Sequence, residues 1–320
     1  MIRFPEGIDA EQFLRDYWQR KPLLIRQGLP GFHSPLDGDE LAGLALEEDV
    51  ESRIVMEQGF DGPWELHHGP FGEADFRRLP DDSPWTLLVQ AVDLWLPEVR
   101  ALIDEFDFLP RWRIDDIMVS YANDRGGVGP HFDHYDVFLV QGSGKRRWQV
   151  GPSCDETSPL LEGTPLKILA DFQATAEYIL EPGDILYLPP RVAHLGEAVG
   201  ECMTYSVGFR APTGTEMLSD LATELASRDI DLDYRDPPLT PDMASDTIDP
   251  AFIREARKVL YRILDDETLL GEWFASYMTA PRYPDLDADE PAQRRRAWLS
   301  GKPSRLFENG IEIPRPEHGG

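Results

Sequence analysis

The spacing of hydrophobic and polar residues changes along the chain. Between residues 111 and 212, short apolar or alternating runs are separated by Gly and Pro, as in "IDDIMVSYA", "YDVFLVQG", "KRRWQVG", "LKILADF", "EYILEPGDILYLPP" and "CMTYSVGFR". Short alternating runs with regularly spaced turn residues are typical of an antiparallel barrel or sandwich. This part of the chain is therefore predicted to form an all-β core.

Two segments before this core have apolar residues at helical spacing. Residues 8–26 begin with Phe13, Tyr17 and Trp18 on one helical face and then switch to the strand-like run "LLIR". Residues 84–106 repeat apolar side chains every three or four positions. Because this period places the apolar side chains on one face of a helix, we expect two helices that cover the core.

Helical spacing returns after the β-rich region. It spans residues 215–228 and 250–278, and the polar, proline-bearing segment between them is predicted to be a linker or long loop. The tail after residue 279 is rich in Pro and charged residues and contributes little to a core. A chain of 320 residues exceeds the usual size of one domain, so we expect one large domain and one or two smaller units.

The composition is that of a globular cytoplasmic protein. Hydrophobic residues make up 41% of the chain, and no apolar run is long enough to cross a membrane. The first residues, "MIRFPEGIDAEQF", lack the apolar core of a signal peptide. The two cysteines, Cys154 and Cys202, fit a reducing compartment and are expected to be free thiols, although a single bridge remains an alternative.

The charge is strongly negative. The chain has 31 Lys and Arg against 59 Asp and Glu, a formal net charge of −28. This balance argues against direct binding of nucleic acid through phosphate contacts, and it allows a basic protein or peptide as partner. Solubility or a salty habitat would explain the same charge.

One short stretch, "GPHFDHYDVFLV", concentrates candidate chemistry. If it forms a strand, His131, Asp133 and Tyr135 share one face, whereas His134 and Asp136 share the other. Two ligands two positions apart can bind one metal ion. We therefore predict His131 and Asp133 as ligands, and we expect His134→Ala and Asp136→Ala to leave metal binding intact.

A third ligand is available downstream. In "EPGDILYLPPRVAHLGEAVG", a turn and a buried run are followed by His194. Two histidines and one carboxylate on one face of an octahedral ion leave three positions open, which is typical of non-haem Fe(II) oxygenases. Those positions would hold a co-substrate and dioxygen. The alternative is a core histidine and an unrelated surface pair.

The run "GSGKRRWQV" adds an arginine with an apolar neighbourhood. Arg146 alternates in step with Trp148 and Val150, so it is predicted to point inward. A buried guanidinium needs an anion, and a dicarboxylate co-substrate would supply one. The alternative is a set of solvated edge-strand charges.

The run "DDIMVSYA" places three more polar or polarisable side chains on one face. Asp116, Met118 and Ser120 alternate there. If the face is internal, Asp116 is suited to a cationic substrate and Ser120 to the co-substrate. A polar start to an ordinary strand is the competing interpretation.

In this order, these motifs resemble those of the JmjC-domain ribosomal oxygenases, most closely the bacterial arginyl hydroxylases that modify the sixteenth large-subunit ribosomal protein. The resemblance extends through "YWQRKPLLIR", "LEPGDILYLPP" and "YSVGFRAP", and more faintly to "WFASYM". It implies an α+β fold with a double-stranded β-helix (cupin/JmjC jelly roll) and covering helices in residues 1–212. It also implies a helical dimerisation segment in residues 213–278, hence a homodimer, and a reduced winged-helix-like tail in residues 279–320.

The resemblance also implies roles for single residues. Fe(II) would be bound by His131, Asp133 and His194, and 2-oxoglutarate by Arg146 and Ser120, with dioxygen as second co-substrate. The substrate arginine would be held by Asp116, Met118, Tyr135 and Ser206. The implied reaction is 3-hydroxylation of an arginine in a large-subunit ribosomal protein. The alternatives are a JmjC hydroxylase of another residue, such as a ribosomal histidine, and a non-catalytic dimeric module for a basic partner.

Overall fold

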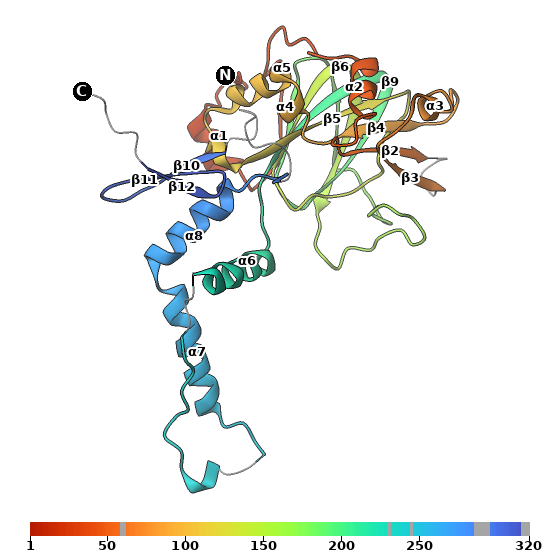
Figure 1. The fold of residues 1–320 in the computed structure, drawn as a ribbon. Helices are drawn as coiled ribbons and strands as arrows, with labels where there is room; N and C mark the ends of the chain where they lie inside the picture. The colour runs from red at the N-terminus through yellow and green to blue at the C-terminus, as the bar shows by residue number, and fades with distance from the viewer. Residues whose placement is uncertain (58–61, 229–231, 244–245, 285–294, 315–320) are drawn as a thin grey trace, which may run out of the picture. The chain divides into compact units, whose positions relative to one another are not determined.

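The computed structural model describes residues 1–57, 62–228, 232–243, 246–284 and 295–314. The chain divides into two compact units, Met1–Ala211 and Pro212–Gly320, which are described separately (Figure 1). No helix among the described residues is long and apolar enough to cross a membrane. Cys154 and Cys202 are free thiols, as expected from the sequence.

The first unit is built on one antiparallel sheet. Its strand order is β1-β8-β6-β9-β5-β4-β2-β3, and β7 also pairs with β6. Its strands are β1 (Leu23–Ile25), β2 (Ser52–Glu57), β3 (Trp64–His68), β4 (Trp85–Val89), β5 (Ile114–Ala122), β6 (Val137–Ser153), β7 (Ala176–Leu180), β8 (Ile185–Leu188) and β9 (Val192–Phe209).

The two longest strands, β6 and β9, run through both halves of the sheet, the half that contains β8 and the half that contains β7. They pair with each other almost throughout, while β8 and β7 pair with opposite ends of β6. The register shifts between Gln141 and Lys145, and Gly144 lies there at φ +62°. A Cβ on Gly144 would lie 2.0 Å from the Glu201 carbonyl oxygen, so this bend requires glycine. The bent pair agrees with the all-β core that the sequence pattern predicted and with the jelly roll that the family resemblance implied.

Short helices and a large apolar core cover one face of the sheet. Figure 1 shows α2, α4 and α5 gathered beside β4, β5 and β9. The core beneath includes the fully buried rings of Phe13, Phe138 and Tyr187. The helical elements are α1 (Ala10–Asp16), α2 (Gly38–Leu44), α3 (Glu73–Phe76), α4 (Val92–Trp95), α5 (Pro97–Arg100) and the 3₁₀ turns η1 (Ala101–Phe106) and η2 (Arg111–Arg113).

The helix predicted over residues 84–106 is wrong in its first part. Residues 85–89 form β4, which pairs with β2 on one side and β5 on the other. Four consecutive side chains there are buried, and such a run suits a central strand as well as a buried helix. Two-sided pairing decides between them. The remainder, residues 92–106, forms short helical turns interrupted at Pro97.

Two other strand predictions also differ from the structure. The run "LKILADF" contains only an isolated bridge, between Leu160 and Leu169, and not a strand. Strands β2 and β3 were not predicted, although β2 carries inward-facing residues that matter below. The predictions for α1, β1 and β5 are confirmed.

The second unit combines helices with a small antiparallel sheet. The predicted helix over residues 250–278 is two helices, because Asp266 caps a new helix by accepting from the Thr268 and Leu269 backbone N–H groups. The tail holds more core than expected, since Phe307 is buried there. The elements are α6 (Gly214–Ser227), η3 (Pro241–Met243), α7 (Pro250–Leu264), α8 (Glu267–Thr279), β10 (Arg296–Leu299), β11 (Arg305–Glu308) and β12 (Ile311–Ile313).

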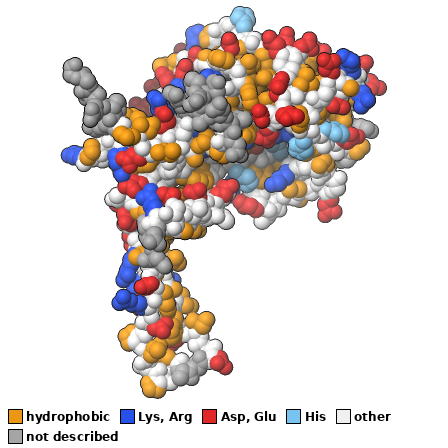
Figure 2. Space-filling view, in the orientation of Figure 1, with side chains coloured by type: hydrophobic (Ala, Val, Ile, Leu, Met, Phe, Trp, Pro, Cys, Tyr) orange, Lys and Arg blue, Asp and Glu red, His pale blue; other side chains and the backbone are white. Residues whose placement is uncertain are grey.

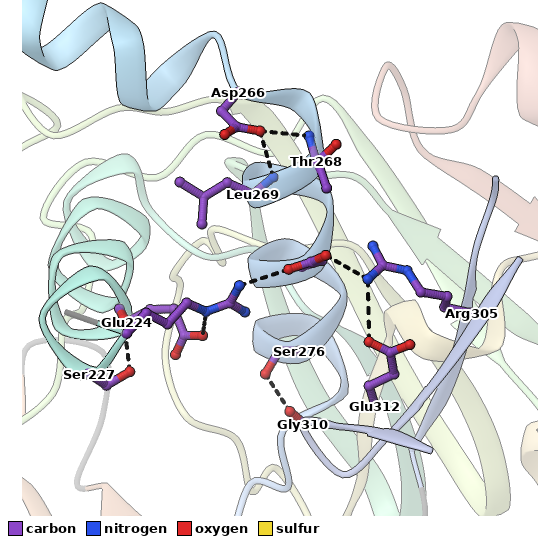
Figure 3. A network of polar contacts seen from close by, with 11 residues as sticks. Glu224, Ser227, Asp266, Thr268, Leu269, Ser276, Arg305, Gly310 and Glu312 are labelled. Carbon is purple, nitrogen blue, oxygen red and sulfur yellow. Dashed lines mark hydrogen bonds and ion pairs between the residues drawn. The ribbon is translucent and has the colours of Figure 1, made fainter. Parts of the chain in front are cut away.

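Ion pairs connect three of these elements. Glu272 of α8 pairs with two guanidinium groups, and one of the two residues, Arg305, is labelled in Figure 3. Arg228, at the end of α6, lies 2.7 Å from one Glu272 oxygen, and Arg305 of β11 lies 2.5 Å from the other. These hydrogen bonds hold the pKa of Glu272 below its usual value. One carboxylate therefore joins α6, α8 and the small sheet.

Candidate metal centre and co-substrate site

Three predicted ligands meet in the first unit. One ligand atom from each of His131, Asp133 and His194 lies within 4.8 Å of the others. His194 belongs to β9, and His131 forms an isolated bridge with it through backbone hydrogen bonds of 3.0 and 2.8 Å. His194 Nε2 lies 3.7 Å from Asp133 Oδ2. The sequence grouping of these residues therefore matches their placement.

The strand assumed for residues 131–136 is wrong. Apart from the bridge at His131, the β6 ladder begins only at Val137. The segment is instead held by its ends and by the Asp133 carbonyl, which accepts from the Arg191 backbone N–H at 2.6 Å. A short segment fixed by a bridge and a loop contact can bring two ligands together without strand alternation.

Both histidine rings are held in the tautomer that suits a metal ligand. His131 Nδ1 lies 2.9 Å from the Gly129 carbonyl oxygen, and His194 Nδ1 lies 3.0 Å from that of Val192. A carbonyl can only accept, so each Nδ1 donates its hydrogen and each Nε2 keeps a lone pair. Burial and the nearby His131 lower the pKa of His194 to about 4, which keeps the ring neutral. Two imidazoles and a carboxylate fit a divalent transition metal.

The other two polar residues of this segment differ from each other. His134 is exposed. Asp136 is fully buried and accepts hydrogen bonds from Tyr187 Oη at 2.6 Å and Gln19 Nε2 at 3.0 Å. Burial raises the pKa of Asp136, while these hydrogen bonds oppose the rise. Asp136 therefore points away from the metal ligands, but into the protein core and not to solvent.

Arg146 is buried without a carboxylate. Its exposed fraction is 3%, and its guanidinium donates to Ser120 Oγ at 3.2 Å and to Thr204 Oγ1 at 3.5 Å. Its Nε has no partner, and no carboxylate in the described part of the chain lies within ion-pair distance of it. Burial lowers the pKa of Arg146. The neighbouring Arg147, by contrast, is half-exposed and pairs with Glu197 at 2.8 Å.

These surroundings fit an incoming anion. A buried cation is costly unless an opposite charge compensates it, and Arg146 has spare donors for one. Ser120 and Thr204 lie opposite each other on β5 and β9. Sequence reasoning missed Thr204, although it lies on the same face of β9 as Ser206, two positions away, and alternation could have found it.

The predicted substrate residues also gather on this inner face. Asp116 lies opposite Gly208, and Met118 lies opposite Ser206. A Cβ placed on Gly208 would be 3.6 Å from Asp116 Oδ1 and 3.9 Å from the edge of the Tyr135 ring. Tyr135 is 41% exposed, yet burial and then the charges of Asp133 and Asp116 raise the pKa of its hydroxyl. One edge of the Tyr135 ring therefore lies beside the Asp116–Gly208 row of the sheet.

Three further residues that contact Asp116 or Met118 were not predicted. Gln90 Nε2 donates to Asp116 Oδ2 at 2.5 Å, and the Ala91 backbone N–H donates to the same oxygen at 3.0 Å. Arg53 of β2 lies with Nη2 3.5 Å from Met118 Sδ. Because β2 was not recognised as a strand, no sequence signal connected Arg53 with this face.

The fold and this set of side chains define a JmjC-type oxygenase centre. A family model described as the JmjC domain matches residues 101–217. The chain is 39% identical over 280 residues to the ribosomal protein uL16 3-hydroxylase of Escherichia coli, covering 87% of this chain and 73% of that protein. It is 38% identical over 296 residues to a probable ribosomal oxygenase of Haemophilus influenzae, covering 89% and 72%.

Solved structures agree with this relationship. The crystal structure of E. coli YcfD matches with a TM-score of 0.83 and 34% identity, covering 99% of this chain and 89% of that one. A structure of YcfD in complex with cobalt and 2-oxoglutarate matches with a TM-score of 0.81 and 35% identity, covering 98% and 88%. The chain belongs to the JmjC-domain ribosomal oxygenase family.

Proposed function

We propose that the protein is an Fe(II)- and 2-oxoglutarate-dependent dioxygenase that hydroxylates a ribosomal protein. The observation that carries this proposal is the joint presence of the His131–Asp133–His194 cluster and the buried, carboxylate-free Arg146. The described relatives support it, because one is named a uL16 3-hydroxylase and another structure holds cobalt and 2-oxoglutarate.

The residues divide the work as follows. His131, Asp133 and His194 would hold the iron, and Arg146 with Ser120 would bind a carboxylate of 2-oxoglutarate. When bound, iron and 2-oxoglutarate supply the oxidation of a C–H bond by dioxygen, with succinate and CO₂ as the other products. The protein supplies the orientation of the substrate and the exclusion of water.

The favoured reaction is 3-hydroxylation of an arginine in a large-subunit ribosomal protein. Asp116 would take the guanidinium, because its buried carboxylate is already oriented by Gln90 and Ala91. Met118, Tyr135 and Ser206 would shape the surrounding site. Ribosomal proteins are basic, and the net charge of −28, visible as widespread acidic side chains in Figure 2, favours such a partner. We propose no direct contact with nucleic acid, and a ribosomal substrate would place the protein in the cytoplasm.

A turnover assay with a matched control tests this function. Purified protein is mixed anaerobically with Fe(II), 2-oxoglutarate and a peptide carrying the target arginine, and air is then admitted. We expect succinate release and one added oxygen on the arginine, detected by mass spectrometry. His131→Ala should abolish both, whereas His134→Ala should retain them because His134 is exposed. Oxygen added only to a histidine-bearing ribosomal peptide would assign the alternative substrate.

We further propose that residues 213–278 join two copies into a homodimer, with residues 279–320 as a winged-helix-like region. Ile253, Leu260 and Leu264 of α7 are 55%, 60% and 41% exposed, and their spacing places them on one side of the helix. Figure 2 shows hydrophobic side chains along this helix. A single amphipathic helix of this length gains stability by covering such a stripe. Light scattering should give a dimer, and Leu260→Glu should give a monomer.

A further inference from the structure

Few buried polar side-chain atoms lack a hydrogen-bond partner. In the described ranges there are four such atoms, Ser52 Oγ, Arg113 Nε, Arg146 Nε and Trp148 Nε1. Two of them, on Arg146 and Trp148, lie two positions apart on β6 and therefore on the same face. Buried donors are normally satisfied, so a pair of unsatisfied donors on one face indicates a missing acceptor.

The indole of Trp148 lies between the proposed anion site and the metal ligands. Along the β6–β9 ladder, Trp148 pairs with Gly196, while the neighbouring inward rows are Arg146 with Ala198 and Val150 with His194. The Arg146 guanidinium carbon is 5.3 Å from the centre of the Trp148 ring, and the His194 ring centre is 5.9 Å away.

The two edges of the Trp148 indole have different surroundings. A Cβ on Gly196 would lie 2.5 Å from Trp148 Cζ3 and 2.7 Å from Cη2, so the six-membered ring is pressed against the β9 backbone. Nε1 lies on the opposite edge of the indole and is directed away from this contact. Trp148 is 6% exposed, so solvent is not an adequate partner for this N–H.

We infer that Trp148 is a co-substrate-binding residue whose Nε1–H donates to the carboxylate of 2-oxoglutarate that Arg146 also binds. This inference rests on the proposed function. It explains why two buried donors on one face have no acceptor among the described residues. Tryptophan chosen only to fill space would be replaced by phenylalanine at little cost to co-substrate binding, and this difference makes the role testable.

The first test observes the N–H directly. The protein is labelled with ¹⁵N-tryptophan, loaded with Zn(II) as a redox-inert substitute for iron, and titrated with 2-oxoglutarate. One indole N–H resonance should move downfield on binding, and that resonance should be absent from the spectrum of Trp148→Phe. If 2-oxoglutarate binds by calorimetry but no indole resonance moves, the inference is overturned while the proposed function stands. If 2-oxoglutarate does not bind the metal-loaded protein at all, the proposed function fails.

The second test measures affinity. Trp148→Phe keeps an aromatic ring and removes the donor, so the Kd for 2-oxoglutarate should rise about tenfold, as for a lost hydrogen bond to a charged group. Succinate keeps the distal carboxylate and lacks the keto group, and its Kd should rise by the same factor. The affinity for Mn(II) should stay unchanged. Trp298→Phe in the second unit, where Trp298 is exposed, is the matched control and should change none of these values. Equal Kd values for wild type and Trp148→Phe would refute the role.

Discussion

Two sets of arginines in this molecule face opposite electrostatic situations. In the second unit, Arg228 and Arg305 both contact Glu272, and all three side chains are partly exposed. In the first unit, Arg146 is almost completely buried, and its hydrogen-bond acceptors in the described part of the chain are hydroxyl and carbonyl oxygens. The paired arginines connect secondary-structure elements, whereas Arg146 has no carboxylate partner among the described residues and is proposed to bind one from the co-substrate.

The difference teaches how to separate structural charges from binding charges. A carboxylate beside a guanidinium satisfies it and leaves little capacity for an anion. A buried guanidinium with only neutral acceptors costs stability, and this cost is recovered when an anion binds. Arg146 should therefore matter for binding and not for folding, and the arginines around Glu272 should behave in the opposite way.

The largest effect is expected at Arg146. Arg146→Met should reduce succinate formation by about 10³-fold, because it removes a buried charge partner worth ~3–5 kcal/mol. Without 2-oxoglutarate, its thermal stability should be unchanged or higher, because an uncompensated buried charge is lost. Arg147→Met is the matched control and should keep activity, since Arg147 is half-exposed and pairs with Glu197. A strongly destabilised Arg146→Met protein would contradict the comparison.

Asp136 should show the reverse pattern, a loss of stability. Asp136→Ala leaves the buried Tyr187 hydroxyl and the Gln19 amide without their acceptor, which should cost about 2–3 kcal/mol in urea unfolding. His134→Ala should change stability by less than ~0.5 kcal/mol because His134 is exposed. Below the unfolding transition, both variants should still bind Mn(II). Loss of metal from folded Asp136→Ala would show that this acid also positions the ligand segment.

Glu272→Gln should have a smaller effect, confined to stability. Its two ion pairs are partly exposed, so removing the charge should cost roughly 1 kcal/mol at low salt and less at high salt. Succinate formation and 2-oxoglutarate affinity should equal those of the wild type. A change in co-substrate affinity would break the distinction between the two sets of arginines.

The smallest effect on stability is expected at Glu57, a partly buried acid whose charge is opposite to that of Arg146. Burial, and then repulsion from Glu197, raise its pKa to about 7 against the attraction of Arg125. The folded state therefore holds this proton more tightly than the unfolded state, so its contribution to stability is complete below about pH 4.5 and is lost as pH rises to about 7. Glu57→Gln should remove this loss. We expect the variant to be more stable by up to ~1 kcal/mol at pH 8 and equal to wild type at pH 4.5, measured by urea unfolding.

Sequence patterns correctly predicted the strands in which side chains alternate between two faces and which pair in a regular ladder. The alternation of Asp116, Met118 and Ser120 corresponds to a regular ladder with β9, and the inward position of Arg146 follows from the regular ladder around it. The predicted grouping of His131, Asp133 and His194 also matches the structure, although the strand that was assumed for residues 131–136 is absent there. In that case, motif resemblance was a better guide than local geometry.

The features that were missed depend on contacts distant in the sequence. The run of residues 85–89 became a strand because β2 and β5 lie on both sides of it, which no local period encodes. The burial of Asp136 was not predicted because its partners, Tyr187 and Gln19, are far away in the chain. Gln90 and Arg53 reach the inner face from strands or turns that were not predicted.

The bend at Gly144 has a consequence for redesign of the site. Along the β6–β9 ladder, Arg146 of β6 and His194 of β9 lie on one side of this bend. Ser206 of β9 lies on the other side. Under the proposed function, this bend lies between the residues proposed for the co-substrate and Ser206, which is proposed for the substrate. Because a side chain at position 144 would collide with the Glu201 carbonyl oxygen, the place to redesign this bend is the opposite strand, by short insertions between Val199 and Met203.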